Sequence, residues 1–229
     1  MHMHMEASME EKSEKFRPKA MGIFESVFDV CYLLFDLVAG ILFLKNADGR
    51  LVFELYGALA LVLGGGDAFH LVPRIKVNLF GRSEKSDFWL GLGKAITSET
   101  MTVFYLILFM IWTEMFPAYL ASTKVVFVLF ACAFVRMVLC LFPQNNWFHP
   151  EGSLRWSLYR NIPFTVVGAI MMVLFYQTGM THMTWAILLS FGCYLPVTML
   201  ASKIPPIGAL MMPKTLAYVW MIAMGLKLL

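Results

Sequence analysis

The sequence predicts an all-α polytopic membrane protein, built as a bundle of seven transmembrane helices. Hydrophobic residues make up 59% of the 229 residues and charged residues only 14%, which is far from the composition of soluble domains. Seven apolar runs follow one another, each near the ~20 residues that a helix needs to cross a bilayer. They cover about 22–44, 51–73, 88–113, 123–142, 162–179, 182–202 and 207–229. The alternating segments of a strand barrel do not occur.

Positive charge is distributed unevenly between the connections, which predicts the orientation. The amino-terminal arm and the connections after the second, fourth and sixth runs hold Lys12, Lys15, Arg17, Lys19, Arg74, Lys76, Arg82, Lys85, Arg155, Arg160 and Lys203. The other side has only Lys45, Arg50, Lys124 and Lys227. By the positive-inside rule we expect the amino terminus in the cytoplasm and the carboxy terminus outside a cell membrane. Residues 1–21 are expected to form a flexible cytoplasmic arm, and 22–229 one transmembrane domain.

The first apolar run carries three acids on one stripe. Glu25, Asp29 and Asp36 are spaced by four and seven residues, and Tyr32 shares their face. Because acids that face lipid are very costly, this stripe is expected to face the interior of the bundle or a wet cavity.

The second run ends in the polar sequence around which the candidate site is predicted. Asp67, His70 and Arg74 are spaced by three and four residues, so the histidine ring could bridge a carboxylate and a guanidinium. The glycines at 64–66 allow close approach of another helix or a ligand. Pro73 is expected to break the last turn and to release a carbonyl toward the cytoplasmic interface. A purely structural polar cluster is the alternative.

The third run is polar on two sides, which is typical of a central helix. Lys94, Ser98, Thr102 and Tyr105 share one stripe, whereas Glu99 lies about 140° from Lys94 around the axis. The fourth run places Arg136 about two turns from its cytoplasmic end.

The connection at 143–161 interleaves aromatic rings with amides and arginines. Trp147 and Trp156 lie among Asn145, Arg155 and Arg160, a pattern that favours an interfacial collar over a mobile lid. Of the last three runs, the fifth is expected to be scaffold and the sixth to kink at Pro196. The seventh carries Lys214 deep enough to contribute to a site.

Together, these ionisable residues predict a pocket in the cytoplasmic half of the bundle. The candidates for catalysis are Asp67, His70 and Glu99. The candidates for binding are Arg74, Lys94, Arg136, Asn145, Arg160, Lys214, Asp29 and Asp36. The outer half is almost purely apolar, so a pocket open on one side is favoured over a transport route. Asp67 and His70 could chelate a metal with Asp29, Glu99 or His149, so the sequence leaves the metal and any cofactor open.

Leu63, Gly66-Asp67 and the later Gly91-Leu92 resemble the pattern of the YhhN-type lysoplasmalogenase-like family of membrane hydrolases. The resemblance covers about a fifth of the chain and implies a role for Asp67 in hydrolysing vinyl-ether lysophospholipids. Ser98-Glu99 and Val135-Arg136 depart from the Ala-His and Ser-Asp pairs of that family. The whole chain is also similar to bacterial integral membrane proteins.

Two functions from different classes follow from this pattern. The first is a lipid-acting hydrolase or transferase, in which Asp67 and His70 transfer protons and basic residues hold a lipid phosphate. The second is a small-molecule or proton-coupled transporter, in which buried acids exchange protons. A membrane sensor or scaffold without chemistry is the remaining alternative. We expect membrane lipids and no nucleic acid as partners, and the sequence leaves the oligomeric state open.

Overall fold

The computed structural model describes residues 18–149, 152–201 and 204–229, so most of the expected arm at 1–21 lies outside the described residues. The described part contains seven helices that are long and apolar enough to span a membrane, which confirms the predicted fold class. These are α2 (Ala20–Lys45), α3 (Leu51–Phe80), α4 (Ser86–Met115), α5 (Thr123–Leu141), α6 (Leu154–Gln177), α7 (Thr181–Leu200) and α8 (Met211–Leu226). Two short 3₁₀ helices, η1 (Pro143–Asn145) and η2 (Pro205–Leu210), precede α6 and α8. The side on which each terminus lies stays a prediction.

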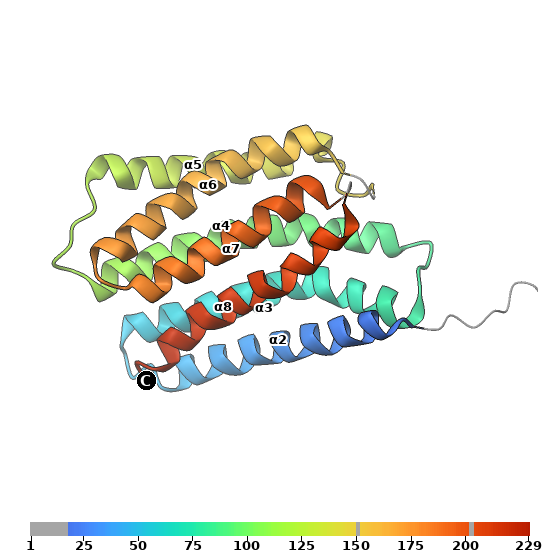
Figure 1. Cartoon of the computed structure of the whole chain (residues 1–229). Coiled ribbons are helices and arrows are strands. Elements are labelled where there is room, and N and C mark those ends of the chain that lie inside the picture. The colour runs from blue at the N-terminus through green and yellow to red at the C-terminus, as the bar shows by residue number, and fades with distance from the viewer. Residues whose placement is uncertain (1–17, 150–151, 202–203) are drawn as a thin grey trace, which may run out of the picture.

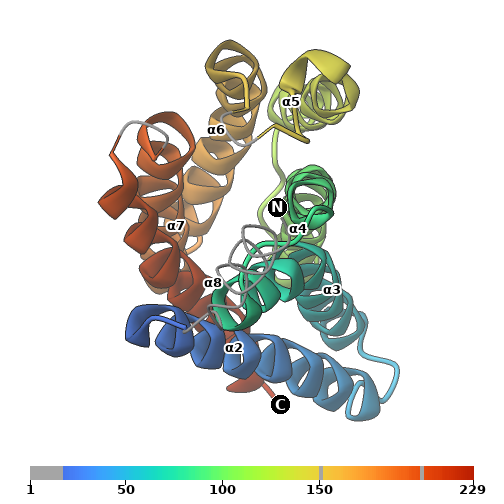
Figure 2. The same cartoon turned by 90° about the vertical axis from the view of Figure 1, so that its right-hand side faces the viewer.

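The seven helices form one closed ring of neighbours (Figures 1 and 2). Each helix packs against the next in sequence, and α8 packs back against α2. Helix α4 also contacts α6 across the ring, as its two polar sides predict for a central helix. We call the end with the α3–α4 and α5–α6 connections the pocket end, and the end with the α2–α3, α4–α5 and α6–α7 connections the far end. The pocket end is the one that the charge distribution predicts to be cytoplasmic.

Helix α3 does not end at Pro73, so the prediction of a broken last turn was wrong. The helix continues to Phe80 with Pro73 inside it. A proline at position 73 cannot donate to the carbonyl of Phe69. That carbonyl lies against Gly93 of α4, where a Cβ atom would also come within 2.6 Å of the Cα atom of His70. The released carbonyl therefore faces a neighbouring helix rather than the interface, and the missing side chain of Gly93 lets the two helices meet there.

Helix α6 begins at Leu154, earlier than the apolar run that starts near 162. Ser153 caps it, because its hydroxyl accepts a hydrogen bond from the backbone N–H of Trp156. The first two turns bury Ser157, Arg160 and Asn161. Since these turns are polar, hydropathy alone assigned them to the preceding loop.

A layer of aromatic rings crosses the bundle between the pocket end and the far end. Tyr105 of α4 packs against Phe164 of α6 and Phe191 of α7, with ring centroids 5.3 and 5.5 Å apart. Phe104 of α4 packs against Tyr218 of α8 at 5.4 Å. We call these five rings the aromatic floor. Beyond it, the far end is a hydrophobic core that includes Phe43, Phe53, Tyr56, Trp112 and Phe175.

Candidate functional site

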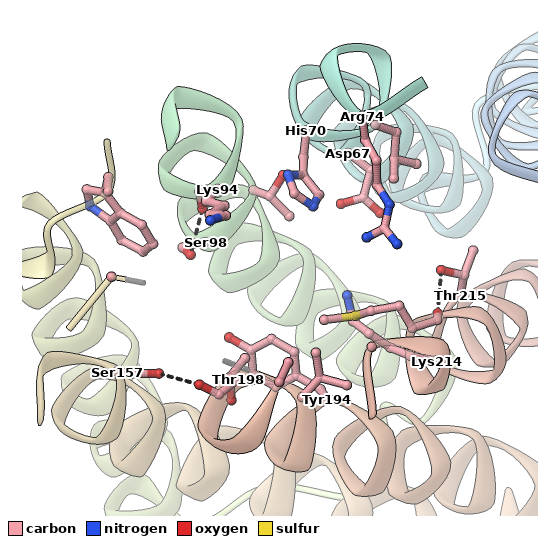
Figure 3. Close-up of a pocket in the computed structure, with 18 of the residues that line it drawn as sticks. Asp67, His70, Arg74, Lys94, Ser98, Ser157, Tyr194, Thr198, Lys214 and Thr215 are labelled. Atoms are coloured by element: carbon pink, nitrogen blue, oxygen red, sulfur yellow. Dashed lines mark hydrogen bonds between the residues drawn. The ribbon is translucent and has the colours of Figure 1, made fainter. Parts of the chain in front are cut away.

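A pocket of about 460 Å³ lies at the pocket end, lined by residues of six helices and of the α5–α6 connection (Figure 3). Asp67, His70 and Arg74 of α3 project into it from one side, and Lys214 of α8 enters from the other. Eight predicted site residues line it: Asp29, Asp67, His70, Arg74, Lys94, Asn145, Arg160 and Lys214. The floor lies one turn or more deeper on the same helices, because Phe164 follows Arg160 and Tyr218 follows Lys214 by four residues.

On the α3 side, each charged side chain has its own partner from α2. The hydroxyl of Tyr32 donates a hydrogen bond of 2.8 Å to Oδ2 of Asp67, and both residues are buried. Nη2 of Arg74 donates to Oε2 of Glu25 at 3.1 Å. His70 therefore does not bridge Asp67 and Arg74 as predicted. Its buried Nδ1 has no hydrogen-bond partner among the described residues, so the ring keeps a nitrogen for other chemistry.

Three basic groups of the pocket have no acidic partner. Lys94, Arg160 and Lys214 form no ion pair with any carboxylate in the described ranges. Lys214 is only 7% exposed, and its Nζ lies 5.0 Å from the ring centroid of Tyr218, a cation–π distance. Buried charges are normally paired, because transfer out of water is costly. Basic groups around one pocket can attract an anion.

The α5–α6 connection forms a fixed wall of the pocket. The side-chain amide of Asn145 donates to three carbonyls at the end of α5, those of Leu139, Cys140 and Phe142, at 2.8 to 3.3 Å. Its own oxygen accepts a 2.6 Å hydrogen bond from Nη1 of Arg160. The Arg160 guanidinium lies 4.3 Å from the ring centroid of Trp147. These contacts hold Asn145, Trp147 and Arg160 against the end of α5, and the interfacial collar stays a prediction.

The start of α4 packs directly on this wall. A Cβ atom at Gly91 would come within 2.8 Å of the carbonyl carbon of Trp147 and 2.9 Å of the Cα atom of Phe148. Phe88 also stacks on Phe148 with centroids 5.2 Å apart. Glycine at 91 is therefore needed for the contact between α4 and the wall.

The wall made by α6 and α7 was missed from the sequence. The amide nitrogen of Asn161 donates to the hydroxyls of Ser157 and Thr198, both at 3.3 Å, and the Tyr194 hydroxyl donates to its amide oxygen at 3.0 Å. Ser157, Tyr194 and Thr198 also line the pocket. A signal was present, because Ser157 and Asn161 on one helix and Tyr194 and Thr198 on the other are each spaced by four residues.

Three predicted residues lie outside the pocket lining. Arg136 is fully buried, donates to the backbone carbonyl of Ser98 at 3.2 Å and lies over the Phe164 ring at 3.3 Å. Glu99 has a buried Oε1 without a hydrogen-bond partner in the described part of the chain. Asp36 is buried deeper along α2 than Asp29. These groups can act on the pocket only through other residues.

The described residues contain no group of three or more histidine, cysteine, aspartate or glutamate side chains that could hold a metal ion. The chelating set that the spacing of Asp67 and His70 allows is therefore not assembled by Asp29, Glu99 or His149.

A second cavity, of about 600 Å³, lies between the start of α2 and η2. We call it the side groove. It shares Glu25, Arg74, Gly208 and Met212 with the main pocket. Its other lining residues are the apolar Ala20, Met21, Phe24, Pro206 and Ala209. Met21 and Phe24 are 65% and 60% exposed, so the groove adjoins the outer surface of the bundle.

Comparisons of this chain with protein-family models, curated proteins and solved structures gave no match.

Proposed function

We propose that this membrane protein is a lipid-acting hydrolase or transferase whose pocket receives an anionic head group, such as that of a lysophospholipid. The observation that carries the proposal is the presence of two unlike sets of groups in one pocket. Lys94, Arg160 and Lys214 have no carboxylate partner among the described residues, and they line the same pocket of about 460 Å³ as Asp67 and His70. Anion binding and proton transfer need these two kinds of group side by side.

In this proposal the basic side holds the phosphate. Lys94 and Lys214 supply ammonium donors, and Arg160 supplies those of its guanidinium protons that Asn145 does not take. Arg136 is not part of this clamp, because it is committed to Ser98 and Phe164 behind the wall.

The acidic side performs the proton transfers. His70 takes a proton from water or from an acceptor hydroxyl as that oxygen attacks the substrate. The protonated His70 then returns this proton to the leaving oxygen. Asp67 is held in place by Tyr32 and balances the positive charge that develops on the imidazole. The resemblance to the lysoplasmalogenase-like family supports a role for Asp67 of this kind.

The side groove supports a lipid rather than a water-soluble substrate. A head group in the main pocket could place its hydrocarbon chain in the apolar groove past the Glu25 and Arg74 pair, since both residues line both cavities. An opening beside the glycines at 64–66 would be less suitable, because Gly64 packs on Asp36 and Gly66 on Thr100.

Turnover of single-chain phospholipids by the purified protein tests the proposal, with products identified by mass spectrometry. We expect Asp67→Asn and His70→Ala to lose about 100-fold or more of the rate, as for the removal of a general acid or base. Glu114→Gln and His182→Ala change an acid and a histidine at exposed positions of the far end and should keep full turnover. Wild-type melting temperatures in all four variants would exclude misfolding.

Two results would contradict the proposal. One is turnover that is unchanged in folded Asp67→Asn and His70→Ala proteins. The other is loss of folded protein in both variants, together with no turnover of any lipid by the wild type, which would favour a structural polar cluster.

A proton-coupled transporter is the second candidate, favoured by the buried Asp36 beyond the pocket. The aromatic floor and the apolar far end oppose it, because transport requires a path to the other side. Proton or anion flux into vesicles, lost in Asp36→Asn, would favour this candidate.

A further inference from the structure

Asp36 occupies an unusual position near the middle of α2. It is fully buried, and neither of its carboxylate oxygens accepts a hydrogen bond from any residue that the structure describes. Gly64 of α3 provides the space for it. A Cβ atom at Gly64 would come within 2.8 Å of the Asp36 Cβ and 3.3 Å of its Oδ2. The chain therefore reserves room for this carboxyl group, and the nearest donor, the Tyr32 hydroxyl, is given to Asp67 instead.

Asp67, across the interface between α2 and α3, is placed differently. It accepts the hydrogen bond from Tyr32 and lines the same pocket as the basic Lys214. The titratable neighbours that act on Asp36 are Asp67 and Tyr32, and neither carries positive charge. Lys214 and Tyr218 of α8 lie beyond them and act on Asp67 and Tyr32. Of the two carboxyls, Asp67 is the one that accepts the Tyr32 hydrogen bond and lies near the positive charge of Lys214.

An ionised carboxylate without donors in an apolar interior costs more free energy than a folded protein can spare, so such a group binds a proton instead. A second negative charge on Asp67 increases that cost. We propose that Asp36 holds a proton at neutral pH while Asp67 is ionised, and that Asp36 is the buried proton store of the pocket. This inference does not depend on the reaction proposed above.

Tyr32 supplies the route between the two carboxyls. Its hydroxyl already donates to Asp67 and retains lone pairs that can accept. When Asp67 needs a proton, the Tyr32 proton moves to the Asp67 carboxylate and the proton of the Asp36 carboxyl replaces it on the phenol oxygen. Asp36 becomes ionised and now accepts the hydrogen bond of Tyr32, Asp67 becomes neutral, and Tyr32 stays protonated. The Asp36 side chain must move to reach the phenol, because no hydrogen bond joins them in this conformation.

Infrared spectroscopy of the reconstituted full-length protein tests the proposal without any substrate. A protonated carboxyl gives a C=O stretch distinct from that of a carboxylate. We expect this band in the wild type at neutral pH, its loss in Asp36→Asn and its retention in Asp67→Asn. Glu99→Gln controls for the other buried acid without a partner and should leave the Asp36 band in place. In Tyr32→Phe the band should remain. Its shift on transfer to D₂O, which reports exchange of the Asp36 proton, should be about tenfold slower, because the variant loses one hydrogen bond to a charged group.

The proposal is overturned if the wild type shows no protonated carboxyl at neutral pH, or if the band persists in Asp36→Asn. It is also overturned if the band appears only when sodium is removed, because Asp36 would then bind a metal cation. Should Asp36→Asn fail to fold, Gly64→Ala offers a second test, since the new methyl group presses on Asp36 and should shift the band. Gly65→Ala is the matched control, with no atom within 4 Å of the added Cβ, and should leave the band unchanged.

Discussion

The two ends of this bundle are built on opposite principles. At the far end, Phe43 stacks on Phe53 and Tyr56 with centroids 6.3 and 5.2 Å apart, and the Trp112 indole donates to the carbonyl of Leu174. At the pocket end, Lys94 and Lys214 make no hydrogen bond through their ammonium groups to any described residue. The same helices run through both halves, so the two ends differ in the polarity and the pairing of their side chains.

Under the proposed function, the far end provides stability and the pocket end provides chemistry. A protein under selection for stability alone would replace buried unpaired cations by apolar residues. Between the two ends, the aromatic floor separates the polar pocket from the apolar core. If the contrast is correct, substitutions at the far end should change stability and leave ligand binding unaltered, and those of the polar side chains that line the pocket should do the reverse.

The largest effect on stability is expected from Trp112→Ala at the far end. Trp112 is 2% exposed, so its removal leaves a cavity, at a cost of about 3–5 kcal/mol of unfolding free energy. Thermal melts in detergent measure the loss, and Trp185→Ala, at a residue 60% exposed on α7, should cause little change. A Trp112→Ala protein that melts normally but binds lipid poorly would contradict the division between a stabilising far end and a binding pocket end.

A smaller loss is expected from Gly93→Ala at the pocket end. The added methyl group meets the α3 backbone at Phe69 and His70, which cannot move as a side chain can, at a cost of about 1–3 kcal/mol. Because this shift moves His70 relative to Lys94, lipid binding should fall as well. Gly65→Ala is the control, since open space surrounds that position. An unchanged melting temperature and affinity in Gly93→Ala would show that the helix contact does not set the geometry of the site.

Much of this fold could be predicted from the sequence, because each span must form its own backbone hydrogen bonds in the bilayer and must keep its charged side chains away from lipid. For this reason Asp29, Asp67 and Lys214 were placed in a pocket without knowledge of any contact. The helix ends were less predictable. Hydropathy stops where polar residues begin, although α3 continues past Pro73 and α6 starts at Leu154.

The partners of each charge could not be predicted in the same way. Spacing on one helix shows which residues share a face, but it does not show which residue of another helix meets them. Arg74 pairs with Glu25 rather than with His70, and Arg136 turns to Ser98 and Phe164 instead of the pocket. The network around Asn161 was missed because hydroxyl and amide groups are common in membrane helices and carry no charge to mark them.

The central claim, that the unpaired cations form an anion site, is tested most directly by the affinity of the pocket for an alkyl phosphate and for an alkyl maltoside of equal chain length. We expect the wild type to prefer the phosphate. Lys214→Met should weaken phosphate binding by about 10- to 100-fold, because a hydrogen bond to a charged group contributes about 1.5–3 kcal/mol. The melting temperature of this variant should be unchanged. Lys124→Met, at an exposed far-end position, should bind normally. Equal affinity of Lys214→Met and wild type for the phosphate would contradict the account.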